Sequence, residues 1–176
     1  MGDCFHGKDL NILVIGLNSA GKSTLINKLK PEICQQKEVR PTNGFETPWI
    51  PFRNYCLRFR DMGGASNYRP LWQNHVEDLH GIIFVIDSSD STRFSTAAEE
   101  LHAVCSLSAV QARPIPILVF ANKNDLEESA PKDVIERSLR LNEISNHVCN
   151  VMSVCSQYSK DILQGIEWLV MRQTVA

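Results

Sequence analysis

The sequence lacks several features that would place the protein in a membrane, outside the cell or on nucleic acid. No apolar run is long enough to span a bilayer, and no secretory leader precedes the first apolar segment. Its six cysteines form no C-x2-C pair and have no histidine at zinc-binding spacing, so neither a zinc site nor a disulfide framework is indicated. The 18 basic residues are scattered among 20 acidic ones, which argues against nucleic-acid binding. We expect a cytoplasmic protein with reduced cysteines.

The 176 residues suffice for one domain with a sound core, and apolar segments alternate along the chain with amphipathic ones. Apolar segments predict strands at Leu10–Ile15, Gly81–Ile86, Ile115–Ala121 and His147–Val154, and the nearly continuous apolar runs at residues 82–86 and 115–120 suit strands that helices cover on both faces. Amphipathic segments predict helices at Lys22–Lys30, Asn67–Leu79, Ser91–Ser108, Pro131–Leu139 and Ser159–Arg172. The pattern indicates an α/β protein, with helices on both faces of a mostly parallel sheet.

The segment between the first two strands has a different period. Alternating polarity predicts a strand over Tyr55–Arg60, paired in a hairpin with Phe45–Phe52. Pro48 and Pro51 favour an edge position for Phe45–Phe52, because proline cannot donate to a central ladder. The expected sheet therefore has six strands, one of which is an antiparallel edge strand.

The most informative segment is GLNSAGKST at residues 16–24, which matches the phosphate-binding pattern G-x-x-x-x-G-K-[ST]. It follows a predicted buried strand and opens into a predicted helix, which is the context that the pattern requires. Backbone N–H groups and the helix N-terminus cradle phosphates, while Lys22 reaches the β- and γ-phosphates and the Ser23 hydroxyl ligates Mg²⁺. A nucleoside polyphosphate is the expected ligand.

Two later motifs narrow the choice of nucleotide. Asp61-Met62-Gly63-Gly64 ends the second hairpin strand, where an aspartate can hold Mg²⁺ through water and Gly64 can offer its N–H to a γ-phosphate. Asn122-Lys123-Asn124-Asp125 directly follows an apolar strand. The Asp125 carboxylate can accept hydrogen bonds from N1–H and the 2-amino group of guanine, whereas adenine would leave it unpaired. These motifs favour GTP or GDP as the ligand.

Together these motifs resemble those of Ras-superfamily GTPases, specifically the ADP-ribosylation-factor and ADP-ribosylation-factor-like (Arf/Arl) branch. The branch patterns P-T-x-G-F and R-P-L-W recur at residues 41–45 and 69–72, and a similar ending lies at residues 165–169. The likeness covers residues 9–172. Residues 25–31 and 82–90 are most similar to the branch member that serves the ciliary Bardet–Biedl coat.

The resemblance implies a P-loop GTPase domain at residues 10–174 after a short leader at residues 1–9. It implies a monomeric switch that cycles between GDP and GTP to recruit effectors in membrane or ciliary trafficking, and that meets exchange factors and activating proteins through its switch regions and hairpin. The implied nucleotide-binding residues are Asn18, Ser19, Ala20, Gly21, Lys22, Ser23, Thr24, Thr42, Gly64, Asn122, Lys123, Asp125, Cys155 and Ser156.

Several of these residues carry particular roles in the related proteins. Lys22, Thr42 and Gly64 would serve catalysis, and Thr42 would join Ser23 in holding Mg²⁺, with Asp61 acting through water. Cys155 lies in a loop whose backbone meets guanine O6, although a place in the core is an equal alternative. In the second switch, Trp72 either receives effectors or packs on its own sheet.

The sequence departs from the family pattern at position 65. The family has glutamine directly after D-x-G-G, where it orients the attacking water, and this chain has Ala65. An alanine methyl cannot make that hydrogen bond, so we expect GTP binding with very slow intrinsic hydrolysis. The alanine is either a natural loss or an engineered change; the further departures Ser66 and Asn67 favour a natural loss.

The amino end is a second departure, because only a short leader precedes the first strand. Gly2 stands where myristoylation occurs, but His6 replaces the usual serine or threonine. Cys4 can carry a palmitoyl chain, and two lipids together would anchor the protein peripherally on a membrane. The alternative is a plain polar leader.

Two other functions compete with the GTP switch. A non-hydrolysing interaction module that keeps GTP as a structural ligand is compatible with Ala65. A small-molecule P-loop kinase fits the sequence less well, because the sequence offers no arginine-rich lid and the segment at residues 122–125 argues against ATP.

Overall fold

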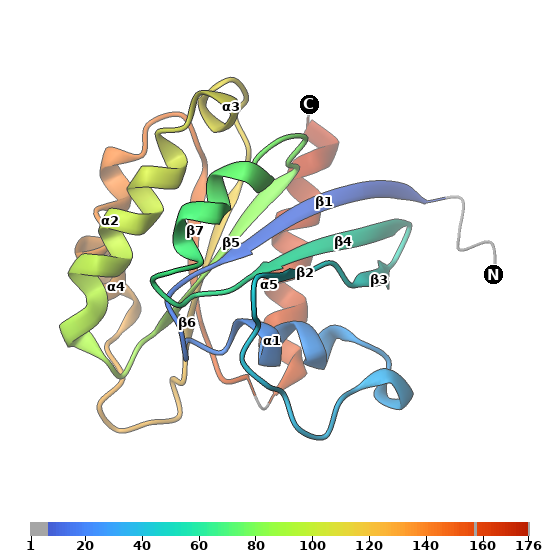
Figure 1. The fold of residues 1–176 in the computed structure, drawn as a ribbon, viewed down its shortest axis with the longest axis horizontal. Coiled ribbons are helices and arrows are strands. Elements are labelled where there is room, and N and C mark those ends of the chain that lie inside the picture. Colours follow the sequence, from blue (N-terminus) through green and yellow to red (C-terminus); the bar gives the residue numbers. More distant parts are fainter. Residues whose placement is uncertain (1–6, 157, 176) are drawn as a thin grey trace.

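A single sheet organises the molecule, and the computed structural model describes residues 7–156 and 158–175. Neighbouring strands follow the order β2-β4-β1-β5-β6-β7, and β3 also pairs with β4 (Figure 1). The parallel strands are β1 (Lys8–Ile15), β4 (Tyr55–Met62), β5 (Gly81–Asp87), β6 (Ile117–Asn122) and β7 (Cys149–Val154). β2 (Phe45–Glu46) and β3 (Trp49–Phe52) run antiparallel to β4. The predicted α/β class and mostly parallel sheet are confirmed.

The predicted edge strand is present in two pieces, which brings the sheet to seven strands. Pro48 lies between them and has no N–H with which to continue the ladder. Its carbonyl accepts a hydrogen bond from the Phe59 N–H at 3.0 Å, so β4 stays attached across the interruption.

Helices cover both faces of the sheet. On one face, α1 (Lys22–Leu29) and α5 (Ser159–Met171) pack on the inward residues of β1 and β4. The other face carries η2 (Arg69–His75), α2 (Phe94–Cys105), α3 (Ser108–Gln111) and α4 (Lys132–Ser138). Short turns complete the chain: η1 (Glu32–Cys34), η3 (Ser91–Arg93), η4 (Leu141–Glu143) and η5 (Arg172–Val175).

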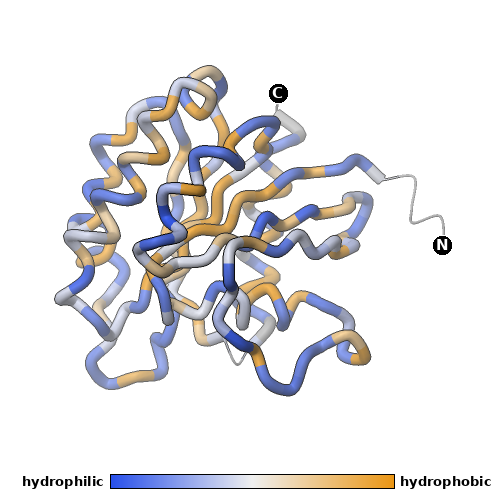
Figure 2. The backbone as a smooth tube through the Cα atoms, viewed as in Figure 1, coloured by the Kyte–Doolittle hydropathy of each residue, from blue (hydrophilic) through white to orange (hydrophobic). Residues whose placement is uncertain are grey.

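The apolar residues explain this layering. The central strands form the most hydrophobic stretch of the backbone in Figure 2, and β6 is buried along its whole length. A strand that is apolar on both faces must be covered by helices on both faces. Because the central strands are parallel, their carboxyl ends all lie at one edge of the sheet. Within the described residues, no helix is both long and apolar enough to cross a membrane.

Two predicted helices differ from the observed ones. The segment 67–79 forms only the short 3-10 helix η2, because Arg60 Nη1 donates to the carbonyls of His75 and Glu77, at 2.7 and 2.8 Å, and Asp78 has a positive φ of 54°. The predicted helix at Ser91–Ser108 corresponds to η3, α2 and the first residue of α3, and the extended conformation of Leu107 separates α2 from α3.

Candidate functional site

A cavity of about 470 Å³ opens where the carboxyl ends of the parallel strands meet the loops that follow them. This is the edge at which open α/β sheets bind ligands, and the volume suits a small molecule. The predicted site residues that line it are Asn18, Ser19, Gly21, Lys22, Ser23, Thr24, Thr42, Gly64, Asn122, Lys123 and Ser156. Val39, Arg40, Pro41, Asn43, Met62, Gly63, Ala65 and Tyr68 complete the lining. Of these, the sequence motifs had included Pro41, Asn43, Met62, Gly63 and Ala65, whereas no motif had included Val39, Arg40 or Tyr68.

The remaining predicted site residues lie elsewhere. Ala20, Asp61 and Cys155 are buried behind the lining, with side-chain exposures of 5% or less. Asp125 is exposed on the loop after β6 and does not line the cavity. The buried thiol of Cys155 agrees with a place in the core, which the sequence had left open.

The phosphate loop, residues 16–21, connects β1 to α1 and is stabilised by the Lys22 side chain. The Lys22 ammonium donates to the carbonyls of Gly16 and Leu17, at 2.8 and 2.9 Å. Burial lowers its pKa from 10.5 to about 8, against the opposing attraction of Asp61. Because an ammonium has three donors, one remains for a ligand oxygen, and a bound phosphate would favour the charged form.

Three oxygen-bearing side chains meet beside the phosphate loop. Ser23 Oγ lies 2.8 Å from Thr42 Oγ1, so the loop before β2 touches the start of α1. Burial raises the pKa of Asp61 from 3.8 to about 6, although a hydrogen bond with Ser23 and the charge of Lys22 oppose the rise. Asp61 Oδ1 is buried with no partner among the described residues. Hydroxyl and carboxylate oxygens are the donors that Mg²⁺ prefers, so this cluster fits that ion.

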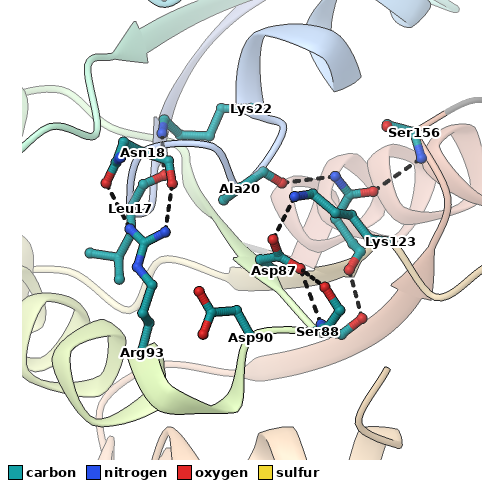
Figure 3. A network of polar contacts seen from close by, with 12 residues as sticks. Leu17, Asn18, Ala20, Lys22, Asp87, Ser88, Asp90, Arg93, Lys123 and Ser156 are labelled. Carbon is teal, nitrogen blue, oxygen red and sulfur yellow. Dashed lines mark hydrogen bonds and ion pairs between the residues drawn. The ribbon is translucent and has the colours of Figure 1, made fainter. Parts of the chain in front are cut away.

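Asn122 joins three separate loops at the other end of the cavity, including those of Ala20 and Ser156, which Figure 3 labels. Its fully buried amide donates to the carbonyl of Ala20 at 2.8 Å and accepts from the Ser156 N–H at 3.0 Å. The loops after β1, β6 and β7 are thereby fixed relative to one another without help from a ligand.

Lys123 is held by a partner that sequence reasoning did not find. Its ammonium pairs with the Asp87 carboxylate at the end of β5, as drawn in Figure 3. Burial alone would raise the pKa of Asp87, but hydrogen bonds from Lys123 and Ser89 outweigh it and lower the pKa. The one available signal was the position of Asp87 at a strand end beside the phosphate loop.

The loop after β4 fits closely under the phosphate loop. The Asn18 N–H donates to the Gly64 carbonyl at 3.0 Å, and a Cβ on Gly64 would lie 2.5 Å from Asn18 N and Gly16 O. Arg93 donates to the carbonyl of Asn18 at 3.0 Å and to its side-chain oxygen at 2.7 Å. Ala65 follows Gly64 in the cavity wall.

Trp72 belongs to the core and does not form a docking surface. It is only 1% exposed, and its indole N–H donates to the Gly63 carbonyl at 3.0 Å. Exposed aromatic side chains lie instead on the antiparallel edge strands, at Phe45 in β2 and Trp49 in β3, which are 49% and 50% exposed.

Comparisons with known proteins show the family of the chain. A family model, the ADP-ribosylation factor family, matches residues 2–173. The chain is similar to ADP-ribosylation factor-like protein 6 of Danio rerio, with 34% identity over 162 residues that span 92% of this chain and 87% of the relative. Its fold is similar to the Arl6 BBS3 small GTPase from Trypanosoma brucei, solved with the nucleotide analogue GppNp; the TM-score is 0.87 at 25% identity, over 95% of this chain and 98% of that one. The chain therefore belongs to the ADP-ribosylation factor family of small GTPases.

Proposed function

We propose that the protein is a GTP-dependent switch of the Arf-like type, which recruits effectors in membrane or ciliary trafficking. Binding of a guanine nucleotide follows from its family. The observation that carries the proposal is the 2.8 Å contact between the Ser23 and Thr42 hydroxyls, since it joins the phosphate grip to the loop that would sense a third phosphate. With GTP bound, the N–H groups of Thr42 and Gly64 would contact the γ-phosphate, and its loss would release both segments.

The phosphates and their ion would be held by the cluster beside α1. The free donor of Lys22 would reach the β- and γ-phosphates, while Ser23 and Thr42 would ligate Mg²⁺ and Asp61 would act through water. When bound, Mg²⁺ neutralises charge on the β- and γ-phosphates. Asp61 Oδ1, which has no hydrogen-bond partner among the described residues, supports this arrangement, because a buried polar atom without a partner costs free energy.

Guanine would lie at the other end of the cavity. Asp125 does not line the cavity but stands two positions after Lys123, which does. Its carboxylate would accept hydrogen bonds from N1–H and the 2-amino group of a base that extends beyond the lining, and the Lys123 stem would lie along that base. The backbone of Cys155 and Ser156 would meet O6. The brace of Asn122 between the loops of Ala20 and Ser156 supports this role, because it holds the surroundings of the base in place.

Hydrolysis is proposed to be slow. The Ala65 methyl lies in the cavity wall where the family has a water-orienting glutamine, and it can neither donate nor accept a hydrogen bond. Nucleotide binding depends on other residues and would be unaffected. An activating protein could supply the missing group in trans.

Effectors would bind a monomer through the hairpin of β2, β3 and β4, where Phe45 and Trp49 are exposed. The same proposal places the protein in the cytoplasm, with peripheral attachment to membranes through Gly2 or Cys4. Both of these residues lie outside the part of the chain that the structure describes.

The test is to identify the nucleotide that co-purifies with the protein and then to measure exchange. We expect GTP or a mixture of GTP and GDP, with Mg²⁺-dependent affinity for both and no affinity for ATP. Retained ATP would refute the guanine assignment. GDP alone, formed at an ordinary family rate, would mean that another residue performs the role of the missing glutamine.

One alternative function is favoured by a specific observation. Because Ala65 replaces the glutamine, the protein could be a non-hydrolysing module in which GTP is a long-lived mark. Multiple-turnover assays with and without candidate activating proteins separate the two functions, since only a cycling switch would be accelerated.

A further inference from the structure

Three arginines lie near the phosphate end of the cavity, and two of them are already engaged. Arg69 donates to the Gly64 carbonyl through Nε and to Glu100 through Nη1, both at 3.1 Å. Arg93 is bound to Asn18 by two hydrogen bonds, which Figure 3 shows. The positive charges of both arginines contribute to the lowered pKa of Lys22, although burial is the largest cause.

Arg40 is the third of these arginines and differs from the other two. It lines the cavity, and among the described residues its guanidinium has no hydrogen bond or ion pair. It lies two residues before Thr42, in the loop that the Ser23–Thr42 contact fastens to the phosphate loop. Its side chain is exposed, so it can reorient without breaking an existing contact.

We propose that Arg40 binds the terminal phosphate of GTP and stabilises the charge that develops on it during hydrolysis. This inference rests on the proposed function. A guanidinium is planar, permanently charged and able to donate two parallel hydrogen bonds, which makes it a strong partner for phosphate oxygens. GDP lacks the third phosphate, so only GTP gains this contact, and Arg40 raises the affinity for GTP relative to GDP.

In the hydrolysis step, a water oxygen bonds to the γ-phosphorus and the bond from that phosphorus to the β–γ bridging oxygen breaks. The bond's electron pair stays on GDP, and the water proton passes to the released phosphate. Arg40 donates to the γ-phosphate oxygens throughout this step. A guanidinium has no hydrogen-bond acceptor, so Arg40 cannot orient the attacking water and does not replace the glutamine that the family has at position 65.

The first test compares the affinities of the full chain for GppNp and for GDP. Arg40→Ala should weaken GppNp binding by about tenfold or more while changing GDP binding by less than about twofold, because only one ligand loses charged hydrogen bonds. Arg40→Lys should restore part of the preference. Arg113→Ala is the matched control, since Arg113 is exposed and does not line the cavity.

Equal weakening of both nucleotides, or none, would overturn the role of Arg40. A wild-type chain that binds neither nucleotide would instead refute the proposed function itself. The second test measures single-turnover hydrolysis in the Ala65→Gln background, where the rate is measurable. There Arg40→Ala should slow hydrolysis by about tenfold or more at saturating GTP. An unchanged rate would limit Arg40 to binding and overturn its part in hydrolysis.

Discussion

The two ends of the cavity proposed to bind the nucleotide are built in different ways. At the end proposed for the base and inner phosphates, buried groups hold one another: Lys22 binds the carbonyls of its own loop, and Asn122 fixes the loops of Ala20 and Ser156. At the end proposed for the third phosphate, Arg40 is exposed and unpaired among the described residues, while Thr42 is tied down through the Ser23 hydroxyl.

This difference indicates which part of the protein a bound ligand can order. A preorganised region binds tightly but gains little order from its ligand, whereas a loosely held loop can be ordered by one. We therefore expect nucleotide affinity to reside mainly in the first region and the response to GTP in the second. The following predictions test this division.

The largest effect should come from the preorganised end. Lys22→Ala should weaken the binding of both GDP and GTP by about 10- to 100-fold, because its one free donor makes a hydrogen bond from a charged group, which contributes about 1.5–3 kcal/mol. Calorimetric titration measures both affinities, and Lys28→Ala on the same helix is the control. Selective loss of GTP binding alone would contradict the division.

Asp61 should make the nucleotide-free protein sensitive to pH. Its pKa is raised from 3.8 to about 6 in the folded state, so the folded chain binds this proton more tightly than the unfolded one. The resulting stability is present below about pH 4 and is lost as the pH rises through 6, amounting to about 2–3 kcal/mol. Denaturant unfolding across this range, compared with Asp61→Asn, isolates the contribution. Identical pH profiles for the two proteins would contradict it.

Restoring the family residue should change the rate but not the affinity. Ala65→Gln is expected to accelerate single-turnover hydrolysis by about tenfold or more, since it supplies the group that orients water. Ser66→Gln is the control, because it puts the same side chain at a neighbouring position that does not line the cavity. No acceleration with Ala65→Gln would refute this account of slow hydrolysis.

The smallest effect is expected at Asn18. Asn18→Asp would turn the hydrogen bond between its side chain and Arg93 into an ion pair, but this contact is exposed, so the gain in stability should stay below about 1 kcal/mol. The melting temperature should rise by no more than about 2–4 °C and lose that rise in high salt. A gain that persists in an Arg93→Gln background would show that the pair is not its source.

Local sequence patterns predicted the structural features that depend on residues close together in the sequence. The strand, glycine loop and helix around residues 16–24 follow from periodicity and from the phosphate motif. Trp72 shows the limit, because the same apolar side chain suits a core or a docking face, and only the position of the Gly63 carbonyl decides.

Contacts between distant segments could not be predicted in this way. The pairs Arg93–Asn18 and Lys123–Asp87 join residues 75 and 36 positions apart, and the packing of the sheet brings them together. The shortened helix at residues 69–75 has a similar cause, since a strand residue, Arg60, binds the carbonyls that a longer helix would use.

The close approach of Gly21 to Asn122 has a consequence for how such a sequence can evolve. Gly21 has a φ of 95°, and a Cβ there would overlap the Asn122 amide that braces the base end of the cavity. That amide is buried and bonded to Ala20. A side chain at position 21 would therefore displace the amide that links the loops of Ala20 and Ser156. Lineages that keep the Asn122 brace should keep Gly21 as well, although the two residues lie in different motifs.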